Sequence, residues 1–251
     1  MLDVGYVGSK GTRLIVTYPD LNMPLVLVDP RTPGLASVAA RRPDQLFQRA
    51  VTADKSVGNS IYHALQVKAE RRMEQGLTFL AAYTYAKSIS GPSDIGGQIG
   101  GGFYIGTPQN PYYAQGDRSV SGFDLKHRVV GTVIYDVPFF HNLHGVGKYA
   151  LDGWQLSTIM TAQSGFPSPV TSNLDTTGTG ITSRPNQVPG QDGNLPSDKR
   201  SWQHWFNTGA FIQAAYGAFG TSPRTNAFRL PGLVNFDSSV NKDFRFGERT
   251  G

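Results

Sequence analysis

The chain has 251 residues, including 30 glycines and 16 prolines, and only 16% of its residues are charged. This composition excludes a coiled coil or a helical bundle, and a hydrophobic fraction of 39% is too high for a disordered polar chain. The net charge of +5 is not gathered into a basic stripe, so we expect no nucleic-acid partner. The sequence contains no cysteine, which removes disulfides and thiolate metal sites, and no apolar run approaches the roughly 20 residues of a membrane-spanning helix.

Alternation of apolar and polar residues with a period of two predicts six strands. In chain order they are a short strand at Leu2 to Tyr6, then 61–72, 77–86, 128–138, 154–163 and 235–245. Each has one apolar side: Leu65, Val67 and Ala69, for example, alternate with Gln66 and Lys68. The second and third strands are separated by a tight turn and form a predicted hairpin.

The predicted connections alternate between long ones (9–60, 88–127 and 164–234) and shorter ones (73–76 and 139–152). Long structureless loops are unusual in a compact domain. A transmembrane β-barrel, in contrast, has short periplasmic turns, longer extracellular loops, strands of roughly ten residues and an apolar outer face. We therefore predict an all-β fold, namely part of a transmembrane antiparallel β-barrel with long extracellular loops.

Aromatic girdles are also expected at the two edges of the apolar band. The candidates beside the 139–152 connection are Tyr135, Phe139, Phe140 and Trp154. Those at the opposite ends of the strands are Tyr83, Tyr85 and Phe166. Because hydrocarbon offers no hydrogen-bond partner to strand N–H and C=O groups, a sheet spans a bilayer only when it closes. Six strands are too few for closure, so the chain is expected to be about six strands of a larger barrel.

A secreted β-sandwich that binds carbohydrate is the alternative, because such domains also alternate and are rich in glycine and tyrosine. A sandwich gives no reason for the alternation of short and long connections.

Several motifs resemble catalytic or ligand-binding sites only superficially. Asp175-Thr176-Thr177-Gly178 differs from the aspartic-protease motif by an extra threonine and has no second copy, so a polar loop tip is the preferred interpretation. Ser239 and Lys242 have a helical nucleophile spacing, but on a strand they point to opposite faces. His141 and His144 have too few neighbouring ligands for a metal, and Gly100-Gly101-Gly102 follows no strand-to-helix signal.

Aromatic residues in the long loops are the candidate substrate contacts, because such rings stack on sugars or peptide side chains. They are Tyr104, Tyr112, Tyr113, Trp202, Trp205 and Phe206. The charged residues Asp117, Arg118, Asp124 and Arg128 are interpreted first as a cluster that fixes loop to wall, since charges facing the lumen need partners.

A series of short strings follows one order along nearly the whole chain, and this ordered set is specific although no single string is diagnostic. The strings are Tyr62-His63-Ala64-Leu65-Gln66, Gly76-Leu77-Thr78-Phe79, Tyr83-Thr84-Tyr85-Ala86-Lys87-Ser88, Phe123-Asp124-Leu125-Lys126-His127-Arg128, Gly153-Trp154-Gln155-Leu156, Gln163-Ser164-Gly165-Phe166-Pro167, Arg184-Pro185-Asn186 and Trp205-Phe206-Asn207. The set resembles TonB-dependent outer-membrane transporters of the Oar-like subgroup, whose members carry a carboxypeptidase-regulatory-like domain.

This resemblance implies that residues 1–251 are a fragment of the receptor β-barrel domain, without the plug, the signal peptide and the C-terminal strands. It places the protein in the outer membrane of a Gram-negative type of envelope. The implied partners are outer-membrane lipid, the TonB complex through the absent plug region, and an unknown extracellular substrate that is taken up with TonB energy. We expect no enzymatic activity, no catalytic or metal-binding residues and no cofactor.

Overall fold

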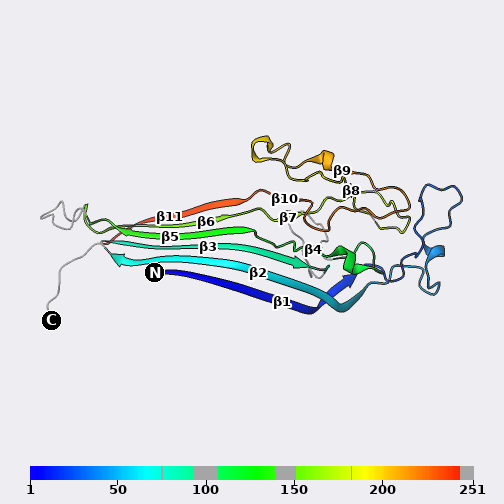
Figure 1. The fold of residues 1–251 in the computed structure, drawn as a ribbon, viewed down its shortest axis with the longest axis horizontal. Helices are drawn as coiled ribbons and strands as arrows, with labels where there is room; N and C mark the ends of the chain where they lie inside the picture. Colours follow the sequence, from blue (N-terminus) through cyan, green and yellow to red (C-terminus); the bar gives the residue numbers. More distant parts are fainter. Residues whose placement is uncertain (75, 93–106, 139–150, 182, 244–251) are drawn as a thin grey trace.

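A computed structural model describes residues 1–74, 76–92, 107–138, 151–181 and 183–243, with the side chains of 72–74 left aside. Its main element is one antiparallel sheet in the order β1-β2-β3-β5-β6-β11 (Figure 1). The strands are β1 (Leu2–Tyr18), β2 (Ala53–Glu74), β3 (Leu77–Ser90), β5 (His127–Asp136), β6 (Trp154–Gln163) and β11 (Leu233–Lys242), and the short β4 (Ser119–Val120) pairs with the end of β3.

The six predicted strands all occur, but the predicted first long connection, 9–60, is too long. Residues 9–18 continue β1, and they pair with the part of β2 that begins at Ala53. The register shifts at Leu14, beside Arg13, which has a φ of 55°. Residues 9–12 and 53–60 are mostly small or polar, so no apolar alternation is visible there in the sequence, and the bulge then breaks the period-two pattern of β1.

The third long connection is not structureless either. It contains two small antiparallel pairs, β7 (Pro167–Ser168) with β10 (Phe228–Arg229) and β8 (Asn186–Gln187) with β9 (Phe211–Ile212). Strands of two residues are too short to give a periodic signal.

The register brings the apolar sides of all six strands onto one face of the sheet. Residues paired directly across antiparallel strands point to the same face. One such row across the whole sheet consists of Val4, Val67, Tyr83, Val129, Ala162 and Val234. The neighbouring row on the opposite, polar face consists of Asp3, Lys68, Ala82, Val130, Thr161 and Asn235.

The apolar face is left open to its surroundings. The exposed fractions are 43% for Leu65, 43% for Val133 and 62% for Phe236. No second sheet packs on this face in the described part of the chain, so the β-sandwich alternative is wrong. An extended apolar face on a single-layer sheet is what a lipid-facing barrel wall requires.

The two turns at one end of the sheet depend on glycine. Gly76 has a φ of 79°, and an added Cβ would lie 2.5 Å from the carbonyl oxygen of Asp136 on the neighbouring strand. Gly153 has the same φ and the same close approach, to the carbonyl oxygen of Asp243. In each case the glycine carbonyl accepts a hydrogen bond from that neighbour's amide, at 2.8 Å, which joins consecutive hairpins.

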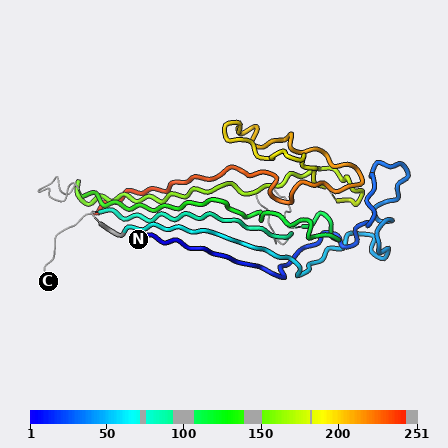
Figure 2. The backbone as a smooth tube through the Cα atoms, in the orientation of Figure 1, coloured from blue at the N-terminus to red at the C-terminus, as the bar shows by residue number. Residues whose placement is uncertain are grey.

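The long connections gather at the other end of the sheet (Figure 2). There they pack on the polar face, where Ala64, Ala86, Ser88 and Ser90 are buried, although most of the sheet is exposed. The described residues contain no helix that is long and apolar enough to cross a membrane.

The opposite character of the two faces leads to a stability prediction. Replacing Val133 by Arg on the apolar face should destabilise the membrane-inserted protein by about 2–4 kcal/mol, because a cation is placed in hydrocarbon. The adjacent Thr132 lies on the polar face, so Thr132→Arg should cost far less. The free energy of unfolding from lipid bilayers in guanidinium chloride measures both, and equal costs would contradict the assignment of the faces.

Candidate functional site in the extracellular loop layer

The described residues of the three long connections, 19–52, 91–126 and 164–232, form one packed unit that we call the loop layer. They hold most of the buried side chains in the part of the chain that the structure describes. The interior of this layer is mainly polar. Its buried residues include Asp20, Asn22, Arg42, Asp117, Ser121, Asp124, Thr176, Thr177, Thr179, Ser183, Ser222, Arg224 and Thr225. Buried polar groups are costly unless they are hydrogen-bonded, so their partners determine the shape of the loops.

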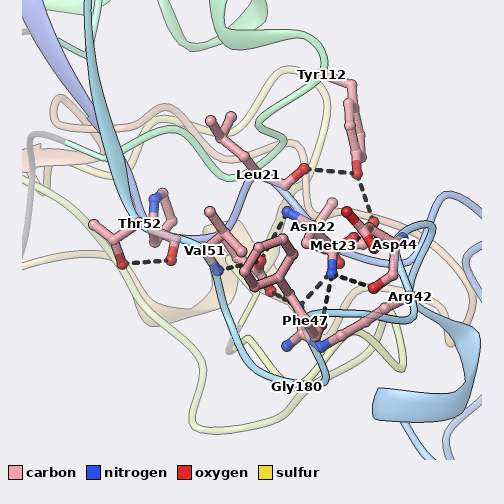
Figure 3. A network of polar contacts seen from close by, with 12 residues as sticks. Leu21, Asn22, Met23, Arg42, Asp44, Phe47, Val51, Thr52, Tyr112 and Gly180 are labelled. Atoms are coloured by element: carbon pink, nitrogen blue, oxygen red, sulfur yellow. Dashed lines mark hydrogen bonds and ion pairs between the residues drawn. The ribbon is translucent and has the colours of Figure 1, made fainter.

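The first loop is organised around a buried ion pair between Arg42 and Asp20, with a nitrogen–oxygen distance of 2.6 Å. Beside it, the side-chain amide of Asn22 donates to the carbonyl oxygens of Asp44 and Phe47, each at 2.8 Å (Figure 3). Asp20 also accepts hydrogen bonds from the amides of Asn22 and Val51. One carboxylate thus holds together both ends of the first loop.

Tyr112 links the second loop to the first. Its hydroxyl donates to the carbonyl oxygen of Met23 at 2.6 Å (Figure 3). Burial raises the pKa of this hydroxyl, the nearby Asp20 carboxylate raises it further, and Arg42 opposes the shift.

The second and third loops are joined to each other and to the wall by two further buried carboxylates. Asp117 pairs with Arg184, and Asp124 pairs with Arg229 at 2.5 Å. Asp124 also accepts a hydrogen bond from the Ser88 amide of β3 at 2.6 Å. These contacts make the third loop lie over the extracellular end of the polar face.

Arg224 completes this connection from the third loop. Its Nε donates to the carbonyl oxygen of Asp117 at 3.0 Å, and its Nη2 reaches Ser90 and the carbonyl oxygen of Gly91 at the end of β3.

The charged cluster predicted from the sequence therefore has different partners from those expected. Asp124 does fix loop to wall, through the Ser88 amide, whereas Asp117 joins the second loop to the third, and the cations of both come from the third loop. Arg118 instead donates to Asn59, and Arg128 lies on the polar face of β5, opposite Thr84 and Gln163. The sequence alone could not supply these pairs, because the partners are more than 60 residues apart in the chain.

Asp175, which the sequence predicts to lie at a polar loop tip, organises a tight turn in the third loop. Its Oδ1 accepts from the amides of Thr177 and Gly178, at 2.9 and 2.8 Å, and its Oδ2 accepts from the Gly180 amide at 2.7 Å. Two carbonyl oxygens of the turn accept hydrogen bonds from other segments. That of Thr177 accepts from the Val28 amide in the first loop, and that of Thr176 accepts from the Gly217 amide elsewhere in the third loop. Burial raises the pKa of Asp175, but hydrogen bonds, first from the Gly180 amide, outweigh it and hold that pKa below 3.8.

A half-open cleft of about 250 Å³ lies between the second and third loops. Its lining includes Tyr113, Asp117, Arg118, Arg184, Ser222 and Arg224. The hydroxyl of Ser222 is buried and has no hydrogen-bond partner among the described residues. The cleft thus presents an aromatic ring and guanidinium groups beside the polar face, and the hydroxyl of Ser222 is enclosed in its wall.

The predicted aromatic contacts fall into three groups. Tyr104 lies outside the described residues. Trp205 donates its indole N–H to the carbonyl oxygen of Arg229 at 2.6 Å, and Phe206 stacks on Phe228 with ring centroids 4.3 Å apart, so both hold the third loop together. Tyr112 likewise has a structural contact, because it links the second loop to the first. Tyr113 and Trp202 are 65% and 88% exposed, which leaves their rings open to a ligand.

Ser239 and Lys242 lie on opposite faces of the sheet, so they form no nucleophile site. Ser239 pairs with Ser157 on the polar face and Lys242 with Trp154 on the apolar face, as expected for a chance match. His141, His144, Gly100-Gly101-Gly102, Phe139, Phe140 and Phe244 lie outside the described residues. Across the residues that the structure describes, no group of three or more His, Cys, Asp or Glu residues could hold a metal ion.

The buried ion pair of the first loop can be tested with one substitution and a matched control. Asp20→Asn should destabilise this loop by about 3 kcal/mol, because it leaves the buried Arg42 without a counter-charge. Hydrogen exchange of the Val51 amide measures the effect. Asp29→Asn removes the same charge from the exposed pair with Arg31 and should leave that exchange unchanged. Equal effects of the two substitutions would show that burial does not determine how much an ion pair contributes to the stability of the loop.

Asp175 predicts a dependence of loop stability on pH. Because its folded-state pKa lies below the unfolded value of 3.8, its contribution is present above about pH 4 and is lost as pH falls through the lowered pKa. Exchange of the Gly180 and Gly217 amides, corrected for intrinsic rates, should be several-fold faster at pH 3 than at pH 7. In Asp175→Asn it should already be fast at pH 7; the same acid-induced increase in that variant would contradict the role of the carboxylate.

The comparisons with known proteins agree with this architecture. None of the curated proteins and none of the solved structures matches the chain. The family model of the outer membrane beta barrel domain matches residues 1–251. With its antiparallel sheet, its uncovered apolar face and its loops gathered at one end, this protein belongs to the outer membrane beta barrel domain family and is located in the outer membrane.

Proposed function

We propose that this chain forms part of the wall and the extracellular mouth of a TonB-dependent receptor of the Oar-like type, which takes up an extracellular substrate without catalysing a reaction on it. The observation that carries the proposal is the loop layer, which is fixed over the polar face by buried ion pairs from Asp117 and Asp124. The ordered strings of the sequence and the barrel family support the same function.

The loop layer offers this function two kinds of surface. The exposed rings of Tyr113 and Trp202 can stack on a sugar ring or a peptide side chain. The cleft beside Tyr113 adds hydrogen-bond donors from the guanidinium group of Arg184. The class of substrate captured there would be polar and small enough for about 250 Å³, or would be a polar end of a larger molecule.

Energised uptake requires that the mouth respond to the inner-membrane energy source. Loops held by few ion pairs can change arrangement as units when those pairs are exchanged. Arg184 and Arg229 are the cations whose release would break the ion pairs between the third loop and the second, while Arg224 keeps its hydrogen bonds to the end of β3.

Labelling from outside the cell tests both the orientation and the energy coupling. The chain has no cysteine, so Trp202→Cys introduces one thiol in the loop layer, and a membrane-impermeant maleimide should label it on intact cells. Leu151→Cys, 45% exposed at the opposite end of the sheet, is the matched control and should react only after the outer membrane is permeabilised.

For the TonB step, labelling at position 202 in the presence of culture medium should differ at least several-fold between cells with and without TonB. Surface labelling that is the same in both would remove the TonB-dependent part of the proposal and leave the barrel assignment. Labelling at position 151 on intact cells would overturn the orientation.

A further inference from the structure

The apolar face carries a set of basic side chains at its extracellular end. Lys10, His63, Lys87 and His127 lie one on each of the neighbouring strands β1, β2, β3 and β5, and all are exposed. We call these residues the outer basic band. From the Val4 row to the Lys10 row, this face has no acidic residue among the described side chains. Asp54, on the same strand as His63, lies beyond the β1 bulge and is hydrogen-bonded to Thr17.

The register places the band along the membrane plane. His63 pairs directly with Lys87, Lys10 lies in the row of Ile61 and Ile89, and His127 pairs with Tyr85. From Lys10 to His127 the band therefore descends by four residues of β3, about 14 Å, over three strand spacings, also about 14 Å. This corresponds to an inclination of roughly 45°, close to the strand tilt of membrane barrels, so in the tilted wall the four residues lie at about one depth.

Tyrosine rings mark that depth as the edge of the bilayer. The Tyr6 hydroxyl and the Nδ1 atom of His63 are 2.5 Å apart, and the Tyr83 hydroxyl lies 2.8 Å from Nδ1 of His127. The ring of Tyr85 is 5.2 Å from that of His127. Amphipathic rings gather at the headgroup level of a membrane, which puts the basic groups beside them among the headgroups.

Lys10 and Lys87 have no anionic partner within the described part of the protein. None of its ion pairs includes either residue. In the loop layer, in contrast, Arg42, Arg184 and Arg229 are paired with carboxylates of the chain itself. A basic band on the lipid side, free of acidic residues, is complementary to negative charge at the membrane surface.

We propose that the outer basic band binds the phosphate groups of an acidic lipid in the outer leaflet. The inference rests on the proposed orientation of the barrel in the outer membrane, but not on TonB coupling or on any substrate. Lys10 and Lys87 supply the charge, and His63 and His127, held by their tyrosines, supply hydrogen bonds between and beside them.

The full outer-membrane protein, purified in a neutral detergent, can be tested by native mass spectrometry with added bisphosphorylated lipid A and with the same lipid after enzymatic dephosphorylation. The wild type should retain the phosphorylated lipid at least tenfold more than the dephosphorylated one. The double variant K10Q/K87Q should lose most of this preference, and K10R/K87R should keep it. The matched control K68Q/R128Q removes two positive charges from the polar face and should bind as the wild type does.

Several outcomes would overturn the inference. Equal retention of the two lipids by the wild type would do so without any variant, and so would full retention by K10Q/K87Q or an equal loss in K68Q/R128Q. Competition by millimolar inorganic phosphate with no lipid retained would identify a free-anion site instead, and an acidic protein co-purifying at the band in place of lipid would identify a protein interface.

A separate measurement tests the proposed orientation. Surface labelling at Trp202→Cys reports orientation in the same preparations of cells, so a wrongly oriented barrel is recognised before lipid binding is interpreted. If K10Q/K87Q does not insert, the wild-type comparison between the two lipids still decides the proposal.

Discussion

The backbone of a membrane-spanning sheet has to satisfy its own hydrogen bonds, and the rest of this structure depends on that constraint. In hydrocarbon, strand N–H and C=O groups have no partner except the neighbouring strand. The six strands meet this demand through an unbroken antiparallel ladder from β1 to β11, and consecutive hairpins are joined by Gly76 and Gly153. Closure takes at least eight strands, so strands other than these six complete the wall.

Where the strands leave the lipid, the same demand is met in a different way. The loop layer has few apolar residues to bury, and carboxylates do the organising: Asp20, Asp117, Asp124 and Asp175 each bind backbone amides, and the first three also bind arginines. Breaking such buried pairs is costly, and their geometry specifies one arrangement. The loop layer therefore holds a defined shape over the polar face, as a mouth that recognises a ligand must.

The charged residues of the loop layer and those of the outer face of the sheet are arranged differently. The buried ion pairs of the loop layer connect distant segments of the chain, whereas on the outer face between the Val4 row and the Lys10 row the charged residues described are all basic. Tyr6, Tyr83 and Tyr85 stand between these basic groups and the apolar rows. One sheet thus presents an apolar surface, a basic band above it and a polar face on the opposite side.

Most of the wall could be read from the sequence, because each strand below the bulge alternates strictly and the alternation itself says which side chains share a face. Leu65, Phe79, Val133 and Val240 were assigned to apolar sides strand by strand, and the register then aligned these sides. The upper parts of β1 and β2 were missed, because residues 9–12 and 53–60 are mostly small or polar and the bulge at Arg13 then interrupts the period of β1. The loop layer could not be predicted: Arg184 and Arg229 meet Asp117 and Asp124 only through the fold, and Trp205 and Phe206 turned inward, whereas Trp202 stayed exposed. Local periodicity is determined by the sequence alone, but long-range ion pairs depend on where the folded wall brings the loops together.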